Sequence, residues 1–175
     1  MIEYIPLFCL AASMILLVWM SLVDLKHWIL PDELNAALGI AGIVFHVTTA
    51  YRFVDIEGML AGAAIGAGLL LAIRFFANRH YGRDALGLGD VKLLGAAGLW
   101  LGLEGTINAL TLGAFAGLLH GVAYAAFLSV KTKSPFTIRE LAIPAGPGFA
   151  IGIAGVGAWM YHGYVMETVS ALLAR

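Results

Sequence analysis

Six long apolar stretches take up most of this chain, and they constrain its fold more strongly than any other feature. Each is about long enough to cross a hydrocarbon layer of ~30 Å as an α-helix, the fourth only marginally. They lie near residues 4–23, 35–51, 57–77, 89–103, 106–130 and 144–165. Hydrophobic residues make up 61% of the chain and charged residues only 12%, against roughly 25% charged residues in soluble domains. The sequence therefore predicts an all-α, polytopic membrane protein with about six transmembrane helices.

The remaining composition excludes several classes of function. A net charge of −1 gives no basic field for nucleic acid, and no zinc-finger or P-loop spacing is present. Cys9 is the only cysteine, so we expect neither a disulfide framework nor a four-cysteine metal site. Glu3, rather than a basic residue, precedes the first apolar stretch, which we therefore expect to remain as a helix and not to be cleaved as a signal peptide. The absence of linkers favours a single domain over residues 1–175.

The basic residues predict how the six helices are oriented. Eight of the ten lie on or beside the connections at residues 24–34, 78–88 and 131–143: Lys26, Arg74, Arg79, Arg83, Lys92, Lys131, Lys133 and Arg139. Only Arg52 and Arg175 fall on the side of the two termini. By the positive-inside rule, those three connections face the cytoplasm and both termini lie on the non-cytoplasmic side.

Many of the 22 glycines recur at four-residue spacing inside the apolar stretches. Such faces let helix backbones approach closely in lipid. We expect these glycines to pack helices together within the molecule, and we assign them no chemistry. They are Gly58, Gly62 and Gly66, then Gly113, Gly117 and Gly121, then Gly148 and Gly152.

Asp24 lies where the first apolar stretch ends. A carboxylate near the C-terminus of a helix opposes the helix dipole, and ionisable residues in membrane segments are costly and commonly functional. A catalytic role is one interpretation of Asp24. The other is an interfacial charge paired with Lys26 or Lys92.

Asp32 has a simpler explanation, because it follows Pro31 and precedes the second apolar stretch. This position is typical of a helix N-cap, and the neighbouring Glu33 suits the positive end of the helix dipole. A metal site made by Asp24, Asp32 and Glu33 with His27 is an alternative, but the spacing matches no standard zinc or calcium pattern.

A second aspartate, Asp90, ends the sequence Gly-Leu-Gly-Asp at residues 87–90, just before the fourth apolar stretch. Gly87 and Gly89 permit backbone geometries that a Cβ would forbid, and they leave space beside the carboxylate for an extended peptide. This setting suits a catalytic role for Asp90 in a protease. The alternative, a glycine-rich turn with Asp90 as an N-cap, stays open.

Taken together, these segments resemble the bacterial type IV prepilin peptidases over essentially the whole chain. The resemblance rests on Asp24 followed by Leu-Pro-Asp at residues 30–32, then GLGDVKLL at residues 87–94 and IPAGPG at residues 143–148. It implies that Asp24 and Asp90 are the catalytic pair of a membrane aspartic protease of the GxGD type. One carboxyl would keep a proton while the other activates a water, so the implied reaction requires no metal or cofactor.

The same resemblance implies the substrate and the location. Prepilins, pseudopilins and Flp-type pilins present a basic leader in the cytoplasm, followed by an apolar helix, and the enzyme lies in the cytoplasmic membrane. Larger members of the family also methylate the new N-terminus and carry paired cysteines in an inserted region. Because Cys9 stands alone, we expect no methyltransferase activity here.

The other residues of the two motifs are expected to shape the site or bind substrate. Lys92 is expected to contact phospholipid or orient the peptide. Pro144, Gly146 and Pro147 either offer irregular backbone to the substrate or simply start a helix. The expected site-shaping residues are Gly87, Gly89, Lys92, Pro31, Asp32, Pro144, Gly146 and Pro147. Glu33, Asp84 and Glu140 are candidates to attract a basic leader.

Two other classes of function compete with a peptidase. A small transporter or proton channel would also use intramembrane aspartates, but it would favour ionisable residues near mid-membrane, where only His46 and His120 are candidates. A histidine in an apolar stretch is more often a packing residue than a proton relay. A non-catalytic scaffold would leave the two aspartates without a shared purpose.

Overall fold

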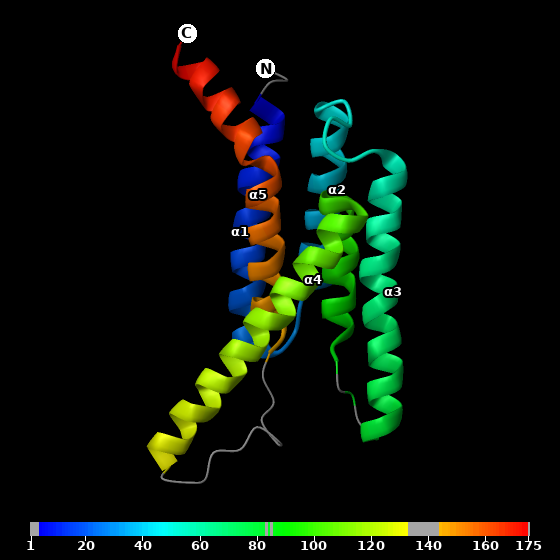
Figure 1. The fold of residues 1–175 in the computed structure, drawn as a ribbon, viewed down its shortest axis with the longest axis vertical. Coiled ribbons are helices and arrows are strands. Elements are labelled where there is room, and N and C mark those ends of the chain that lie inside the picture. The colour runs from blue at the N-terminus through cyan, green and yellow to red at the C-terminus, as the bar shows by residue number, and fades with distance from the viewer. Residues whose placement is uncertain (1–3, 83, 85, 133–143, 175) are drawn as a thin grey trace.

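A computed structural model describes residues 4–82, 84, 86–132 and 144–174. These residues form five helices and no strand: α1 (Ile5–His27), α2 (Asp32–Thr48), α3 (Ile56–Tyr81), α4 (Leu88–Thr132) and α5 (Gly146–Leu173). Figure 1 shows them side by side, with both termini at the same end of the molecule. The prediction of an all-α protein is confirmed.

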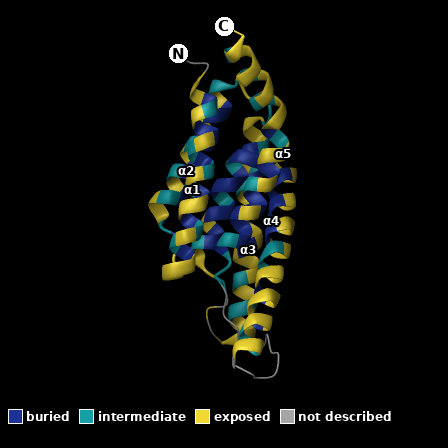
Figure 2. Ribbon diagram, turned by 90° about the vertical axis from the view of Figure 1, so that its left-hand side faces the viewer, coloured by how far each residue is buried: buried dark blue, intermediate teal, exposed yellow. Residues whose placement is uncertain are grey.

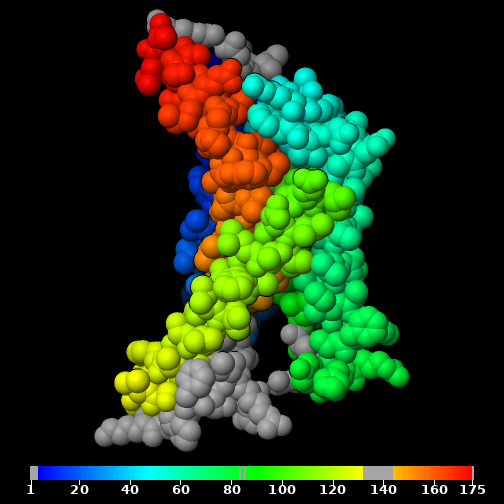
Figure 3. Space-filling model, viewed as in Figure 1, coloured from blue at the N-terminus to red at the C-terminus, as the bar shows by residue number. Residues whose placement is uncertain are grey.

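Helix α4 is interrupted at Gly102, where φ is 66° and ψ is −171°. A positive φ suits glycine because it has no Cβ. The chain turns back at this point, so the two halves of α4 run in different directions (Figure 1). The predicted stretches 89–103 and 106–130 correspond to these two halves. At the end away from the termini, a gap separates the second half from α3 in the space-filling view (Figure 3).

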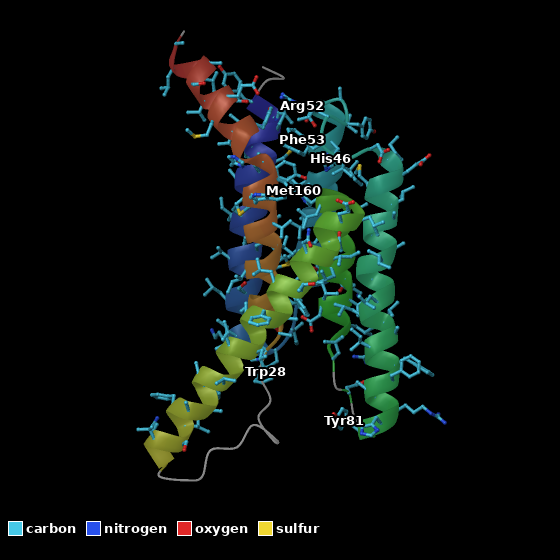
Figure 4. The ribbon with its side chains drawn as sticks, in the orientation of Figure 1. Trp28, His46, Arg52, Phe53, Tyr81 and Met160 are labelled. Atoms are coloured by element: carbon cyan, nitrogen blue, oxygen red, sulfur yellow. The ribbon has the colours of Figure 1, made fainter. Side chains whose placement is uncertain are left out.

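The Trp100 carbonyl, in the last turn before this break, is a meeting point for three helices. It accepts a hydrogen bond from the Tyr161 hydroxyl of α5 and lies 2.9 Å from His46 Nε2 of α2. The Trp100 indole in turn donates to the Leu38 carbonyl at 2.7 Å. His46 is fully buried and stacks edge-on against Phe45. These contacts favour the interpretation of His46 as a packing residue, and Figure 4 shows it towards the end where the termini lie.

Glycines bring α3 and α5 against the two halves of α4. A Cβ at Gly62 of α3 would lie 2.6 Å from the Gly102 carbonyl, and one at Gly66 would lie 2.4 Å from the Leu94 carbonyl. On the other side, a Cβ at Gly152 of α5 would lie 2.2 Å from the Ala109 carbonyl. At these positions the prediction of intramolecular glycine packing is confirmed.

Apolar side chains cover the outside of the bundle as well as its centre. In Figure 2, buried residues gather along the middle of the bundle and exposed residues follow its outer faces. Exposed apolar residues include Phe8, Trp159 and Val130. Of the described helices, α1, α3 and residues 88–131 of α4 are long and apolar enough to cross a membrane. The chain is therefore built to sit in lipid.

Candidate active site

Asp24 lies in the last turn of α1 and is 6% exposed. Its Oδ2 accepts a hydrogen bond from the Gly146 backbone N–H at 2.9 Å. Gly146 is the first residue of α5, so the N-terminus of one helix faces the carboxylate at the C-terminus of another. The positive end of the α5 dipole thereby offsets the unfavourable position of Asp24 on α1.

Helix α1 ends at Trp28, which adopts a left-handed conformation with φ 60° and donates its N–H to the Asp24 carbonyl. Trp28 lies at the end of the molecule away from the termini (Figure 4). Asp24 therefore lies near that end. Among the ion pairs of the described residues, Asp24 takes no part with Lys26 or Lys92. The interpretation as a paired interfacial charge is not supported.

Gly146 fits this contact because it has no side chain. A Cβ at Gly146 would lie 2.6 Å from Asp24 Oδ2. Pro147 follows in the first turn of α5, where a missing N–H costs no helical hydrogen bond. Pro144 lies just before the helix and is half-buried. The described part of the motif thus starts a helix and also presents one backbone N–H to Asp24.

Asp90 lies in the first turn of α4 and is 7% exposed. Its carboxylate accepts a backbone hydrogen bond from Gly87, the residue that precedes the helix. Asp90 is therefore the third residue of α4 and not its N-cap, so the N-cap interpretation is wrong. The bond resembles half of a capping box, in which the third helical residue reaches back to the N-cap backbone.

The two glycines of the Gly-Leu-Gly-Asp sequence act differently from the prediction. The described glycines with positive φ are Gly82 and Gly102, so Gly87 and Gly89 need no unusual backbone geometry. A Cβ at Gly89 would lie 2.7 Å from the Leu30 Cβ. The space beside Gly89 is filled by the connection between α1 and α2, because buried Leu30 packs there.

Asp32 and Lys92 form an ion pair. Lys92 Nζ lies 2.6 Å from both carboxylate oxygens of Asp32. Pro31 is the N-cap of α2, and Asp32 makes no side-chain capping bond, so the N-cap interpretation of Asp32 is wrong. The reason is that its carboxylate reaches α4. The pair ties the start of α2 to the start of α4.

Asp24 and Asp90 act on one another electrostatically, although they come from helices far apart in the sequence. Two carboxylates held near each other and removed from water cannot both ionise at low cost, so such a pair tends to share a proton. One protonated and one ionised carboxyl can act as general acid and general base. The arrangement is therefore chemically suited to hydrolysis.

The structure also places the remaining predicted residues. Asp84 is held by Arg74 at 2.7 Å and by Asn78 at 2.8 Å. Glu33 is exposed in the first turn of α2. Arg83, Lys133, Arg139, Glu140 and Ile143 lie outside the described residues. Among the described residues, no three His, Cys, Asp or Glu are grouped so as to hold a metal ion.

Two buried residues at this end of the molecule, Leu30 and Asn35, are not predicted from the sequence to take part in the site. Leu30 is named only within the Leu-Pro-Asp motif, and its contact with Gly89 is not predicted, because an apolar residue between two helices is common. Asn35 is 4% exposed on α2. Its position one helical turn after Asp32, on the same side of the helix, could have indicated that it lies near Asp32.

Comparison with known proteins identifies the family of this chain. Residues 11–122, which include Asp24 and Asp90, match the model of the Type IV leader peptidase family. A "Prepilin leader peptidase/N-methyltransferase" of Pectobacterium carotovorum subsp. carotovorum is 31% identical over 165 residues, which cover 92% of this chain and 55% of the relative. A protein of the same name from Escherichia coli (strain K12) is 32% identical, covering 82% of this chain and 60% of the relative.

A third relative of the same name, from Xanthomonas campestris pv. campestris, is 33% identical over 77% of this chain and 44% of its own length. The chain thus spans about half the length of the curated relatives it matches. No solved structure matches it. Because the family match extends over more than half of the sequence, the chain belongs to the Type IV leader peptidase family.

Proposed function

We propose that this protein is a membrane aspartic endopeptidase that removes the basic leader from type IV prepilin-like precursors. One observation carries the proposal: Asp24 in the last turn of α1 and Asp90 in the first turn of α4 are both buried at the same end of the bundle. Family membership adds support, since the relatives are named prepilin leader peptidases. Asp24 and Asp90 would be the catalytic pair.

In the proposed reaction, the ionised carboxylate takes a proton from water, which attacks the scissile carbonyl carbon. The protonated partner polarises the carbonyl oxygen and later protonates the leaving amine. The Gly146 N–H would hold the Asp24 carboxylate in position, and the Gly87 N–H would do the same for Asp90. Fixed orientation of both groups favours a single attack geometry.

We further propose that the site works at the cytoplasmic face of the bacterial inner membrane. Trp28 lies at the end away from both termini (Figure 4), which is the side on which most basic residues fall in the sequence. The five helices, with the two halves of α4 counted separately, support six membrane crossings with both termini outside. A prepilin would present its leader junction at this depth.

The proposal is tested by cleavage of a candidate prepilin co-reconstituted with the protein in lipid, followed by mass spectrometry. We expect the wild type to cut at the leader junction, and folded Asp24→Asn and Asp90→Asn variants to be inactive. Normal cutting by either variant would refute the aspartate mechanism. If the wild type cuts no prepilin, proton flux in the same vesicles would test the transporter alternative.

A further inference from the structure

Asn35 is a buried polar side chain that has no partner among the described residues. It is 4% exposed, and neither its Oδ1 nor its Nδ2 makes a hydrogen bond there. Leaving both ends of a buried amide unpaired is costly, and such groups in native proteins generally have a functional reason or a hidden partner. Asn35 therefore points to a ligand that arrives from outside the chain.

Asn35 lines an open groove of about 470 Å³ between α2 and α4. The groove is lined by Asp32, Asn35, Ala36, Gly39, Ile40, Ile43, Lys92, Ala96 and Leu99. One end carries the Asp32–Lys92 ion pair and the other carries the apolar side chains of Ile40, Ile43 and Leu99. The groove thus changes from polar to apolar along the helices.

The polar end of this groove lies at the start of α4, at the same end of that helix as Asp90. Lys92 lies two residues after Asp90 on α4 and holds Asp32. Asp32 follows Pro31, whose carbonyl accepts the backbone N–H of Asn35 at 3.2 Å. Asn35 is therefore in the first turn of α2, at the same end of the bundle as the candidate catalytic pair.

We propose that this groove binds the substrate where its polar leader meets its apolar helix, and that the Asn35 amide hydrogen-bonds one main-chain peptide group there. The inference rests on the proposed peptidase function and names the binding surface that serves it. It makes Asn35 a substrate-binding residue of the site.

A peptide fits the groove better than a lipid. The Asn35 amide offers one acceptor and donors in the same plane, which complement the N–H and C=O of a peptide unit. An anionic headgroup would need a free cation, but Lys92 is already paired with Asp32 at 2.6 Å. The small residues Ala36, Gly39 and Ala96 allow a backbone to approach closely.

The surface is tested by photo-crosslinking with a benzophenone amino acid at Ile40, in the full chain carrying Asp24→Asn and reconstituted with an intact prepilin. A benzophenone at Ile15 of α1 is the matched control, because Ile15 and Ile40 are similarly exposed, at 65% and 61%. We expect prepilin adducts at Ile40 and none at Ile15. Equal adducts at both positions, or lipid adducts alone, would overturn the inference.

The same reconstitution separates this inference from the proposed function. If the wild type cuts prepilin but Ile40 forms no adduct, the groove is wrong and the peptidase proposal stands. If Ile40 forms the adduct but the wild type never cuts, the groove stands and the peptidase proposal fails.

Asn35→Leu tests the amide itself, with Asn108→Leu as control because Asn108 is exposed on the second half of α4. We expect Asn35→Leu to raise KM about tenfold while kcat changes little. Its Tm should stay equal or rise, because a similarly sized apolar side chain replaces an unpaired amide. A lower Tm with unchanged KM would show that an internal water satisfies Asn35, and would overturn its role.

Discussion

The Asp24 carboxylate at the end of α1 accepts the backbone N–H of Gly146 at the start of α5, across 2.9 Å. This one bond joins the first and last helices of the described chain at the candidate catalytic group. A glycine is needed on the α5 side because any Cβ would contact the carboxylate at 2.6 Å. The Pro-Ala-Gly-Pro sequence at residues 144–147 therefore acts on Asp24 directly.

Gly146→Ala should displace Asp24 and reduce kcat by about 10²-fold, because a shift of about 1 Å in a reacting group has that effect. Gly163→Ala is the matched control on α5, since a Cβ there has no neighbour within 4 Å. The control should keep full activity and unfold at an equal or higher temperature. Full activity in Gly146→Ala would mean that the Asp24 contact does not matter for turnover.

Asp24→Asn and Asp90→Asn should each lower kcat by about 10²- to 10⁴-fold, the contribution typical of general acid–base catalysis. The double variant should be no slower than the worse single variant, because groups that act as a unit are non-additive. Single-turnover cleavage of a prepilin measures this. Additive losses would indicate that the two aspartates act independently.

Gly89→Ala should destabilise the fold by about 1–3 kcal/mol, because the new methyl would overlap Leu30 at 2.7 Å. Gly68→Ala on α3 is the control, where a Cβ meets nothing within 4 Å. Leu30→Gly should itself destabilise the fold, because it removes a buried side chain, but Gly89→Ala should cost less in that background than in the wild type. Thermal unfolding in detergent measures the single and double variants; an unchanged Tm in Gly89→Ala would contradict the contact.

The Asp32–Lys92 pair should contribute only about 0.2–1 kcal/mol to stability, because both side chains are partly exposed. A double-mutant cycle with Asp32→Asn and Lys92→Met measures this coupling. Arg52 and Glu167, an exposed pair at the opposite end, provide the comparison. Activity should fall more in Lys92→Met than in Arg52→Met, since only Lys92 lies beside the site.

Glu33→Lys should raise the KM for a prepilin with a basic leader, because Glu33 is exposed and in no described ion pair. Asp84→Lys should raise it less, since Arg74 already neutralises Asp84. Both effects should shrink at high salt, which screens exposed charges. Unchanged KM values at low salt would dismiss electrostatic attraction of the leader.

Several features could be predicted from the sequence because their signals are local. The apolar stretches give the helices, since their length and composition suit a lipid environment. The glycines at four-residue spacing identify Gly62 and Gly152 as packing positions before their neighbours are known. Asp24 and Asp90 are conspicuous because a carboxylate in such a setting is costly.

Only the tertiary structure decided which groups these residues meet. Pairing of Asp32 with Lys92, contact of Leu30 with Gly89 and the bond from Gly146 to Asp24 all join segments far apart in the chain. Local propensity made Asp32 and Asp90 resemble N-caps, but a carboxylate at a helix start has several partners open to it, and packing selects one. The sequence by itself determined the helices and the two carboxylates; the packing of α1, α4 and α5 decided that both carboxylates are buried and that Asp24 meets Gly146, because contacts between distant segments leave no local pattern.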